Sequence, residues 1–114
     1  GYSIERAVPS VADYQRLRAA TGLSPFAEAA VARGLAGSYL GAVLRCNGQV
    51  VGMGRVSGDG GLFFQLTDIA VLPEHQSQGL GSAIVELLLD QLAARIDAPA
   101  YVSLIADGPA HRVY

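Results

Sequence analysis

The residues best suited to chemistry lie in a short polar loop, residues 76–81, between a strand-like run and a long helix with apolar periodicity. A helix start presents backbone N–H groups without an intrahelical partner and the positive end of the helix dipole, and both attract anions. Glycine lets the backbone approach a phosphate closely because it has no Cβ. Gly79 and Gly81 therefore predict a turn that holds phosphate, most suitably the pyrophosphate of a cofactor.

Two other phosphate-binding patterns fit this loop less well. A dinucleotide fingerprint needs a third small residue three positions after Gly81, where Ile84 stands. A Walker loop needs Gly-Lys-Ser or Gly-Lys-Thr, and the segment contains no lysine. A purely structural role for the glycines, as tight-turn residues, is the remaining alternative.

The loop also carries a family resemblance. Its residues read Gln-Ser-Gln-Gly-Leu-Gly and directly follow Asp-Ile-Ala-Val-Leu-Pro-Glu-His. This Gln-x-x-Gly-x-Gly pattern, after a strand and before an apolar helix, resembles the GNAT N-acetyltransferase superfamily, and the resemblance in element order covers nearly the whole chain. It implies acetyl-CoA as co-substrate, with the pyrophosphate on the loop and the pantetheine arm along the preceding strand. The residues expected to bind it are Ile69, Ala70, Val71, Gln76, Ser77, Gln78, Gly79, Leu80, Gly81 and Ser82.

The loop departs from the family in one respect. Many members carry Arg or Lys within it, whereas Ser77 and Gln78 are neutral. Less side-chain charge therefore faces the phosphates, although the backbone site remains.

Acetyl transfer to an amine needs a deprotonated amine, a polarised carbonyl oxygen and a protonated or stabilised leaving thiolate. By family position, Tyr114 is the candidate general acid, because an unperturbed tyrosine with a pKa of about 10 is protonated at neutral pH; packing of the final helix is its alternative role. Asp68 and Glu74 are candidate bases, with Asp68 better placed beside the thioester strand. The competing interpretation of Asp68 is a salt-bridged or bulge-capping carboxylate. Backbone amides of Ile69 or Ala70 would polarise the carbonyl.

Other reactive side chains give weaker indications. The single cysteine, Cys46, excludes an internal disulfide and a multi-cysteine metal site, and we expect it in the core. His75 and His111 are too far apart in the sequence to make a convincing metal site. We therefore expect no metal.

The elements that must position these residues follow from periodicity and capping. Ser10 is a predicted helix N-cap, Ser24-Pro25 predicts a second helix start, and Asn47-Gly48 predicts a tight hairpin. The predicted strands are residues 2–8, 39–46, 49–57, 62–71 and 100–106. The predicted helices are residues 11–21, a second that starts at Pro25 and ends near Gly34 or Gly37, residues 79–96, and a last one starting at 110. The expected fold class is α+β, a three-layer α/β arrangement with a mixed sheet whose last two strands are parallel, because a strand–helix–strand crossover joins them. The resemblance implies that this sheet is GNAT-like and that its last two strands are splayed.

Length, composition and charge limit the number of domains, the kinds of partner and the location of the protein. The chain has 114 residues, 51% of them hydrophobic, which predicts one globular domain. A net charge of −2 gives no basic surface for nucleic acid or membranes, and no apolar run is long enough to span a bilayer, so a cytoplasmic protein is expected. The resemblance implies a Gly-Phe and two more strands after Tyr114, so we expect a domain incomplete at its C-terminus. An exposed last strand would then favour a homodimer.

Two functions remain open from the sequence. The first is an N-acetyltransferase acting on a primary amine of a small molecule or amino-acid-like acceptor. The second is an inactive GNAT-like domain that binds CoA or a protein partner. By resemblance, residues 21–26 would face the acceptor.

Overall fold

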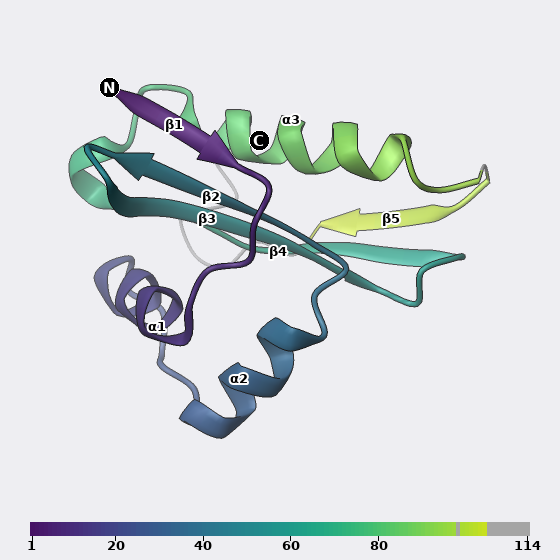
Figure 1. The fold of residues 1–114 in the computed structure, drawn as a ribbon, viewed down its shortest axis with the longest axis horizontal. Helices are drawn as coiled ribbons and strands as arrows, with labels where there is room; N and C mark the ends of the chain where they lie inside the picture. The colour runs from purple at the N-terminus through teal and green to yellow at the C-terminus, as the bar shows by residue number, and fades with distance from the viewer. Residues whose placement is uncertain (98, 105–114) are drawn as a thin grey trace.

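The computed structural model describes residues 1–97 and 99–104. Within them one sheet has the strand order β1-β2-β3-β4-β5, with α3 on one face and α1 and α2 on the other (Figure 1). The predicted start of a last helix, and Tyr114 with it, lies outside the described residues. The strands are β1 Tyr2–Glu5, β2 Leu40–Cys46, β3 Gln49–Gly58, β4 Phe63–Val71 and β5 Tyr101–Leu104, and the helices are α1 Val11–Ala20, α2 Glu28–Ala36, the short 3₁₀ helix η1 Pro73–His75 and α3 Leu80–Ala93.

The pairing of the strands confirms the predicted mixed sheet. From β1 to β4, each strand pairs antiparallel with the next one along the chain, whereas β4 and β5 are parallel. The turn between β2 and β3 has positive φ at both Asn47 (51°) and Gly48 (84°), as the predicted hairpin requires. The parallel pairing joins Phe63 to Tyr101 and ends with Leu66 opposite Leu104. The rest of β4 therefore continues without a described partner on that edge.

The start of α1 is as predicted, but the start of α2 is not. The Ser10 hydroxyl caps α1 by accepting from the Asp13 N–H at 3.1 Å. The prediction of a helix beginning at Ser24-Pro25 is wrong, because α2 begins at Glu28. The Ser24 carbonyl instead accepts from Arg18 Nε at 2.8 Å, and Gln15 bonds to both the N–H and the C=O of Phe26. These side chains of α1 hold the segment in a non-helical path. Of the two glycines at which the sequence could end this helix, the second is the C-cap: the helix continues to Ala36 and Gly37 follows it.

Close packing on the α3 face explains an unusual glycine in β3. A Cβ on Gly54 would lie 2.6 Å from Ile84 Cγ2, 2.7 Å from Ile69 Cδ1 and 3.0 Å from Leu88 Cδ1. Ile84 and Leu88 are fully buried, so these side chains have little room to move. Gly54 therefore lets α3 lie directly on the sheet beside β4.

Candidate active site

The polar loop between β4 and α3 has the geometry of an anion site. Gly79 is the N-cap of α3 with φ of 77°, a left-handed conformation that favours glycine, and no side chain caps it. The first intrahelical bond there runs from the Ala83 N–H to the Gly79 carbonyl at 3.1 Å. The N–H groups of Gly79, Leu80 and Gly81 precede that bond, and the first turn of α3 has no acidic residue.

The loop is also open to a phosphate. Residues 76–79 are exposed, and a Cβ on Gly79 would meet no atom within 4 Å. The side of Gly79 that lacks a side chain is therefore free for a ligand, and the residues present fit a pyrophosphate. The predicted binding residues Gln76 to Ser82 all lie on this loop and the first turn of α3.

The loop is tied to the sheet at its first residue. Gln76 Nε2 donates to the Val71 carbonyl at 2.8 Å. Just before it, His75 Nδ1 lies 2.7 Å from the Tyr2 hydroxyl of β1, and the two rings are edge to face. Gln76 and His75 thus hold the loop in place, a role that was not predicted from the sequence for either residue.

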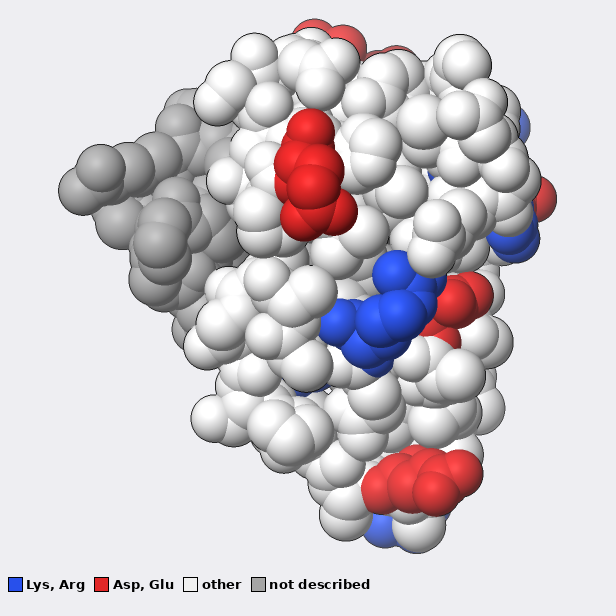
Figure 2. Space-filling model, turned by 90° about the vertical axis from the view of Figure 1, so that its left-hand side faces the viewer, with Lys and Arg blue, Asp and Glu red and all other residues white. Residues whose placement is uncertain are grey.

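Charge on this end of the molecule is sparse. Figure 2 shows the end at which α3 begins: over the described residues drawn, most of the surface is neither acidic nor basic, and the basic groups that are visible lie beside acidic ones. Backbone N–H groups, and not side-chain charge, are therefore the main phosphate donors that the described loop offers.

The second feature of the site is a bulge in β4. Met53 pairs with Ala70 and Arg55 with Thr67, so two residues of β4, Asp68 and Ile69, lie opposite Gly54 of β3. Asp68 has φ of 58°, in the left-handed region. An extra residue in one strand bends it and turns its backbone groups away from the partner strand.

Backbone groups after the bulge point alternately to the two edges of β4. The Leu72 N–H donates to the Val51 carbonyl at 2.8 Å, toward β3, whereas the Val71 carbonyl accepts from Gln76 on the opposite side. By alternation, the N–H groups of Val71 and Ile69 face the open edge and that of Ala70 faces β3. Ile69 and Ala70 are the two residues whose backbone amides were predicted to polarise the carbonyl. Of these two amides, only that of Ile69 faces the open edge, where a ligand could reach it.

Asp68 is surrounded by cations. Its Oδ1 accepts from Arg18 Nη1 at 3.2 Å and its Oδ2 from Arg55 Nε at 2.9 Å. The Asp68 side chain is only 8% exposed. These surroundings fit the salt-bridged, bulge-associated interpretation of Asp68, and they leave each carboxylate oxygen engaged by a guanidinium.

Tyr14 of α1 completes this group. Burial, a side-chain hydrogen bond to Asp68 and the charge of Asp68 raise the pKa of Tyr14, in that order of effect. Sequence reasoning missed Tyr14, Arg18 and Arg55 as parts of the site. An arginine within the otherwise apolar run of β3 was the one available signal for Arg55.

Comparison with known proteins decides the family. The model of the acetyltransferase (GNAT) family matches residues 10–114. The chain belongs to this family. A Staphylococcus aureus protein described as a probable acetyltransferase is 38% identical with a TM-score of 0.91, over 100% of this chain and 86% of that one. No curated protein matches the chain.

More distant structures share the fold. The Escherichia coli ribosomal-protein-alanine N-acetyltransferase is 24% identical with a TM-score of 0.78, over 99% of this chain and 72% of that one. A GNAT acetyltransferase from Brucella melitensis in complex with acetyl-CoA is 21% identical with a TM-score of 0.68, over 98% of this chain and 80% of that one. At these identities the likeness supports the architecture and nothing finer.

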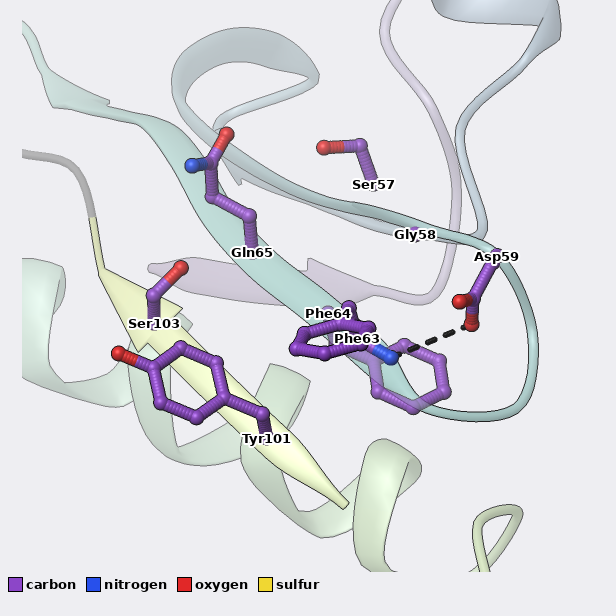
Figure 3. A pocket seen from close by; sticks show the side chains of 8 residues that line it. All are labelled: Ser57, Gly58, Asp59, Phe63, Phe64, Gln65, Tyr101 and Ser103. Carbon is purple, nitrogen blue, oxygen red and sulfur yellow. Dashed lines mark hydrogen bonds between the residues drawn. The ribbon is translucent and has the colours of Figure 1, made fainter.

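A separate cavity of this GNAT domain lies at the other end of β4 (Figure 3). It is a wide-open hollow of about 300 Å³ between the β3–β4 turn and β5. The exposed rings of Phe63 and Tyr101 lie against each other there, with centroids 5.8 Å apart. Sequence reasoning did not find this hollow, which is lined by Ser57, Gly58, Asp59, Phe63, Phe64, Gln65, Tyr101 and Ser103.

The remaining predicted residues divide into three groups. Glu74 is exposed on η1 and is not a member of the ion pairs of Asp68. Tyr114 and His111 lie outside the described residues. Cys46 is half-buried and packs against the core. Among residues 1–97 and 99–104, no cluster of His, Cys, Asp and Glu could hold a metal ion, and no helix is long and apolar enough to cross a membrane.

Proposed function

We propose that this GNAT acetyltransferase moves the acetyl group of acetyl-CoA to a primary amine of a small molecule or amino-acid-like acceptor. The amine attacks directly in a ternary complex, so no residue of the chain becomes acetylated. The observation that carries the proposal is the joining of two features on one strand: β4 has a bulge at Asp68 and leads into the uncapped start of α3. An anion site and a donor for a carbonyl oxygen then lie on one continuous path.

Specific residues of the chain carry out each step of cofactor binding and acetyl transfer in this proposal. The N–H groups of Gly79, Leu80 and Gly81 bind the pyrophosphate, and the edge of β4 after the bulge aligns the pantetheine arm. The Ile69 N–H donates to the thioester carbonyl, where negative charge develops as the amine adds. The carbon–sulfur bond then breaks, and Tyr114 gives its proton to the departing thiolate. The acceptor arrives as the free amine, because both carboxylate oxygens of Asp68 are already bound by Arg18 and Arg55. After the attack, the nitrogen of the acceptor releases its extra proton to water.

The second candidate is a GNAT domain that binds CoA or a protein partner without turnover. It is favoured by the neutral side chains of Ser77 and Gln78, which add no charge to the phosphate site. Strong acetyl-CoA binding with no acetylation of any amine would support it.

Calorimetry with acetyl-CoA, followed by a panel of amines with detection of the released thiol, tests the proposal. The panel contains polyamines, amino sugars, free amino acids and short peptides with N-terminal alanine, the last because a ribosomal-protein-alanine N-acetyltransferase shares this fold. Binding together with thiol release for one class supports the enzyme and names its acceptor. Absence of acetyl-CoA binding would overturn the assignment of the loop.

Assembly and location remain predictions. Tyr101, Val102 and Leu104 of β5 are 40–62% exposed, and β5 is the last strand of the described sheet. We expect a homodimer that covers this strand, which light scattering measures, and a cytoplasmic protein without nucleic-acid or membrane partners.

A further inference from the structure

Asp68 has a backbone conformation that needs support. Of the three described non-glycine residues with positive φ, Asn47 and Ser77 lie in turns, whereas Asp68 lies inside a strand. A left-handed conformation is unfavourable for residues with a Cβ, although aspartate tolerates it better than most. Contacts around Asp68 must therefore favour the bulge over a regular strand.

The contacts come from two arginines on different elements. Arg18 of α1 and Arg55 of β3 each bind a different oxygen of Asp68, at 3.2 Å and 2.9 Å. Charge-assisted bonds to both oxygens fix the direction of the carboxylate as well as its position. The side chain of Asp68 therefore has little freedom to follow a change in its backbone.

Each arginine is itself held in place. Arg18 Nε donates to the Ser24 carbonyl at 2.8 Å, and its guanidinium lies 4.2 Å from the ring centroid of Phe26. Arg55 Nη1 donates to the Gly34 carbonyl at 3.1 Å and to Ser38 Oγ at 2.8 Å. The arginines thus connect the bulge to the α1–α2 segment and to the end of α2.

Burial makes stability alone a poor explanation of this group. The side chains of Arg18, Asp68 and Arg55 are 8%, 8% and 14% exposed. Buried ion pairs lose so much solvation that well-packed apolar residues are often equally stable. Two arginines around one aspartate instead define one geometry of the strand.

We propose that Arg18 and Arg55 are positioning residues that hold Asp68 in its left-handed conformation and so aim the Ile69 N–H at the thioester carbonyl. This inference rests on the proposed function for its catalytic consequence. Neither arginine side chain needs to touch the reacting atoms. Asp68 then acts through its two ion pairs, and not as the base.

The first test replaces Arg55 by methionine. Arg16→Met is the matched control, because Arg16 lies on α1, is 37% exposed, and binds Asp13 at 3.1 Å and the Val50 carbonyl at 2.8 Å in place of Asp68. Removing one oxyanion donor outright lowers kcat by about 100- to 1000-fold, so misdirecting it should lower kcat by about 10- to 100-fold. The KM for acetyl-CoA should change less than about threefold, since the phosphate loop is separate.

Arg55→Lys keeps the charge but not the planar fork of the guanidinium. A kcat of Arg55→Lys between those of Arg55→Met and the wild type supports the positioning role. An unchanged kcat in Arg55→Met overturns the proposal, as does an equal loss in Arg16→Met. If Arg55→Met does not fold, Arg55→Lys and Arg18→Lys are measured against Arg16→Lys by the same criteria.

The second test separates positioning from general-base catalysis. Asn in place of Asp68 keeps the shape and tolerates positive φ but cannot form the ion pairs. A positioning role predicts that Asp68→Asn lowers kcat by a similar factor at every pH, with the shape of the pH profile unchanged. Loss of the acidic limb of the profile would identify Asp68 as the base and overturn the proposal.

A third measurement is independent of turnover. Amide hydrogen exchange of Ala70, whose N–H faces β3 just after the bulge, should be about tenfold faster in Arg55→Met and unchanged in Arg16→Met. If the wild-type chain acetylates no amine but exchange follows this pattern, the proposed function fails while the arginines still hold the bulge. Unchanged exchange in both variants rejects the role of the arginines.

Discussion

Replacement of Gly79 by valine isolates the contribution of the loop backbone to acetyl-CoA binding. A Cβ added there would meet no atom within 4 Å outside its two chain neighbours, so the first carbon of a side chain fits without a clash in the described structure. Its cost to folding is the left-handed φ of 77°, about 1–2 kcal/mol for a residue with a Cβ. The added side chain would stand where a phosphate must approach the backbone.

The loss of affinity can be estimated from the bonds it blocks. A hydrogen bond to a charged group contributes about 1.5–3 kcal/mol, which is a factor of about 10 to 150 in Kd. Blocking one N–H to the pyrophosphate should therefore weaken acetyl-CoA binding by at least about tenfold. Blocking two should remove measurable binding.

Gly22→Val is the matched control. Gly22 has φ of 82°, and a Cβ added there would also meet no atom within 4 Å, but it follows α1 and is far from the loop in sequence. Both variants should lose a similar free energy of unfolding in chemical denaturation, and only Gly79→Val should lose affinity in calorimetry. Unchanged affinity in Gly79→Val, or an equal loss in Gly22→Val, would refute the assignment of the phosphate site.

Four further changes have expected outcomes. Tyr114→Phe should lower kcat with little effect on the KM for acetyl-CoA, and an unaffected rate would return Tyr114 to a packing role. Gly54→Ala should lower the free energy of unfolding by about 1–3 kcal/mol, because its Cβ would lie 2.6 Å from a buried α3 side chain. Gln91→Leu should raise it by about 1 kcal/mol or more, because Gln91 Nε2 is buried without a hydrogen-bond partner among the described residues. Backbone N–H groups, that of Leu62 first, lower the pKa of Asp59, so wild type should be more stable than Asp59→Asn above pH of about 4, with the difference vanishing as pH falls through the lowered pKa.

The parts of the fold that the sequence predicts are those set by local chemistry. The hairpin at Asn47-Gly48 and the cap at Ser10 each depend on residues a few positions apart. The start of α3 after Gly79 is local too, because glycine alone supplies the required φ at low cost. The error at α2 has the opposite cause: Ser24-Pro25 is a sound helix-start signal, but hydrogen bonds from α1 take up the backbone that would have formed the first turn.

The candidate site likewise has one part that depends on neighbouring residues in the sequence and one part that depends on contacts between distant residues. The phosphate loop is contiguous, so its residues could be named from the sequence. The group around Asp68 joins positions 50 and 13 residues apart, those of Arg18 and Arg55, and no periodicity links them. A lone arginine in a strand or an aspartate before an apolar run is compatible with many folds.

The bulge connects these two halves of the site. It places both Asp68 and Ile69 opposite Gly54, so the aspartate reaches the arginines on one face while the isoleucine reaches α3 on the other. Without the extra residue, all side chains of β4 on one side of the bulge would move to the opposite face of the sheet. Either the aspartate or the isoleucine would then be out of place. The packing of α3 through Gly54 and the ion pairs of Asp68 therefore select the same strand register. A change that loosens either one should disturb the Ile69 N–H before it disturbs the phosphate loop, which Gln76 ties to β4 separately.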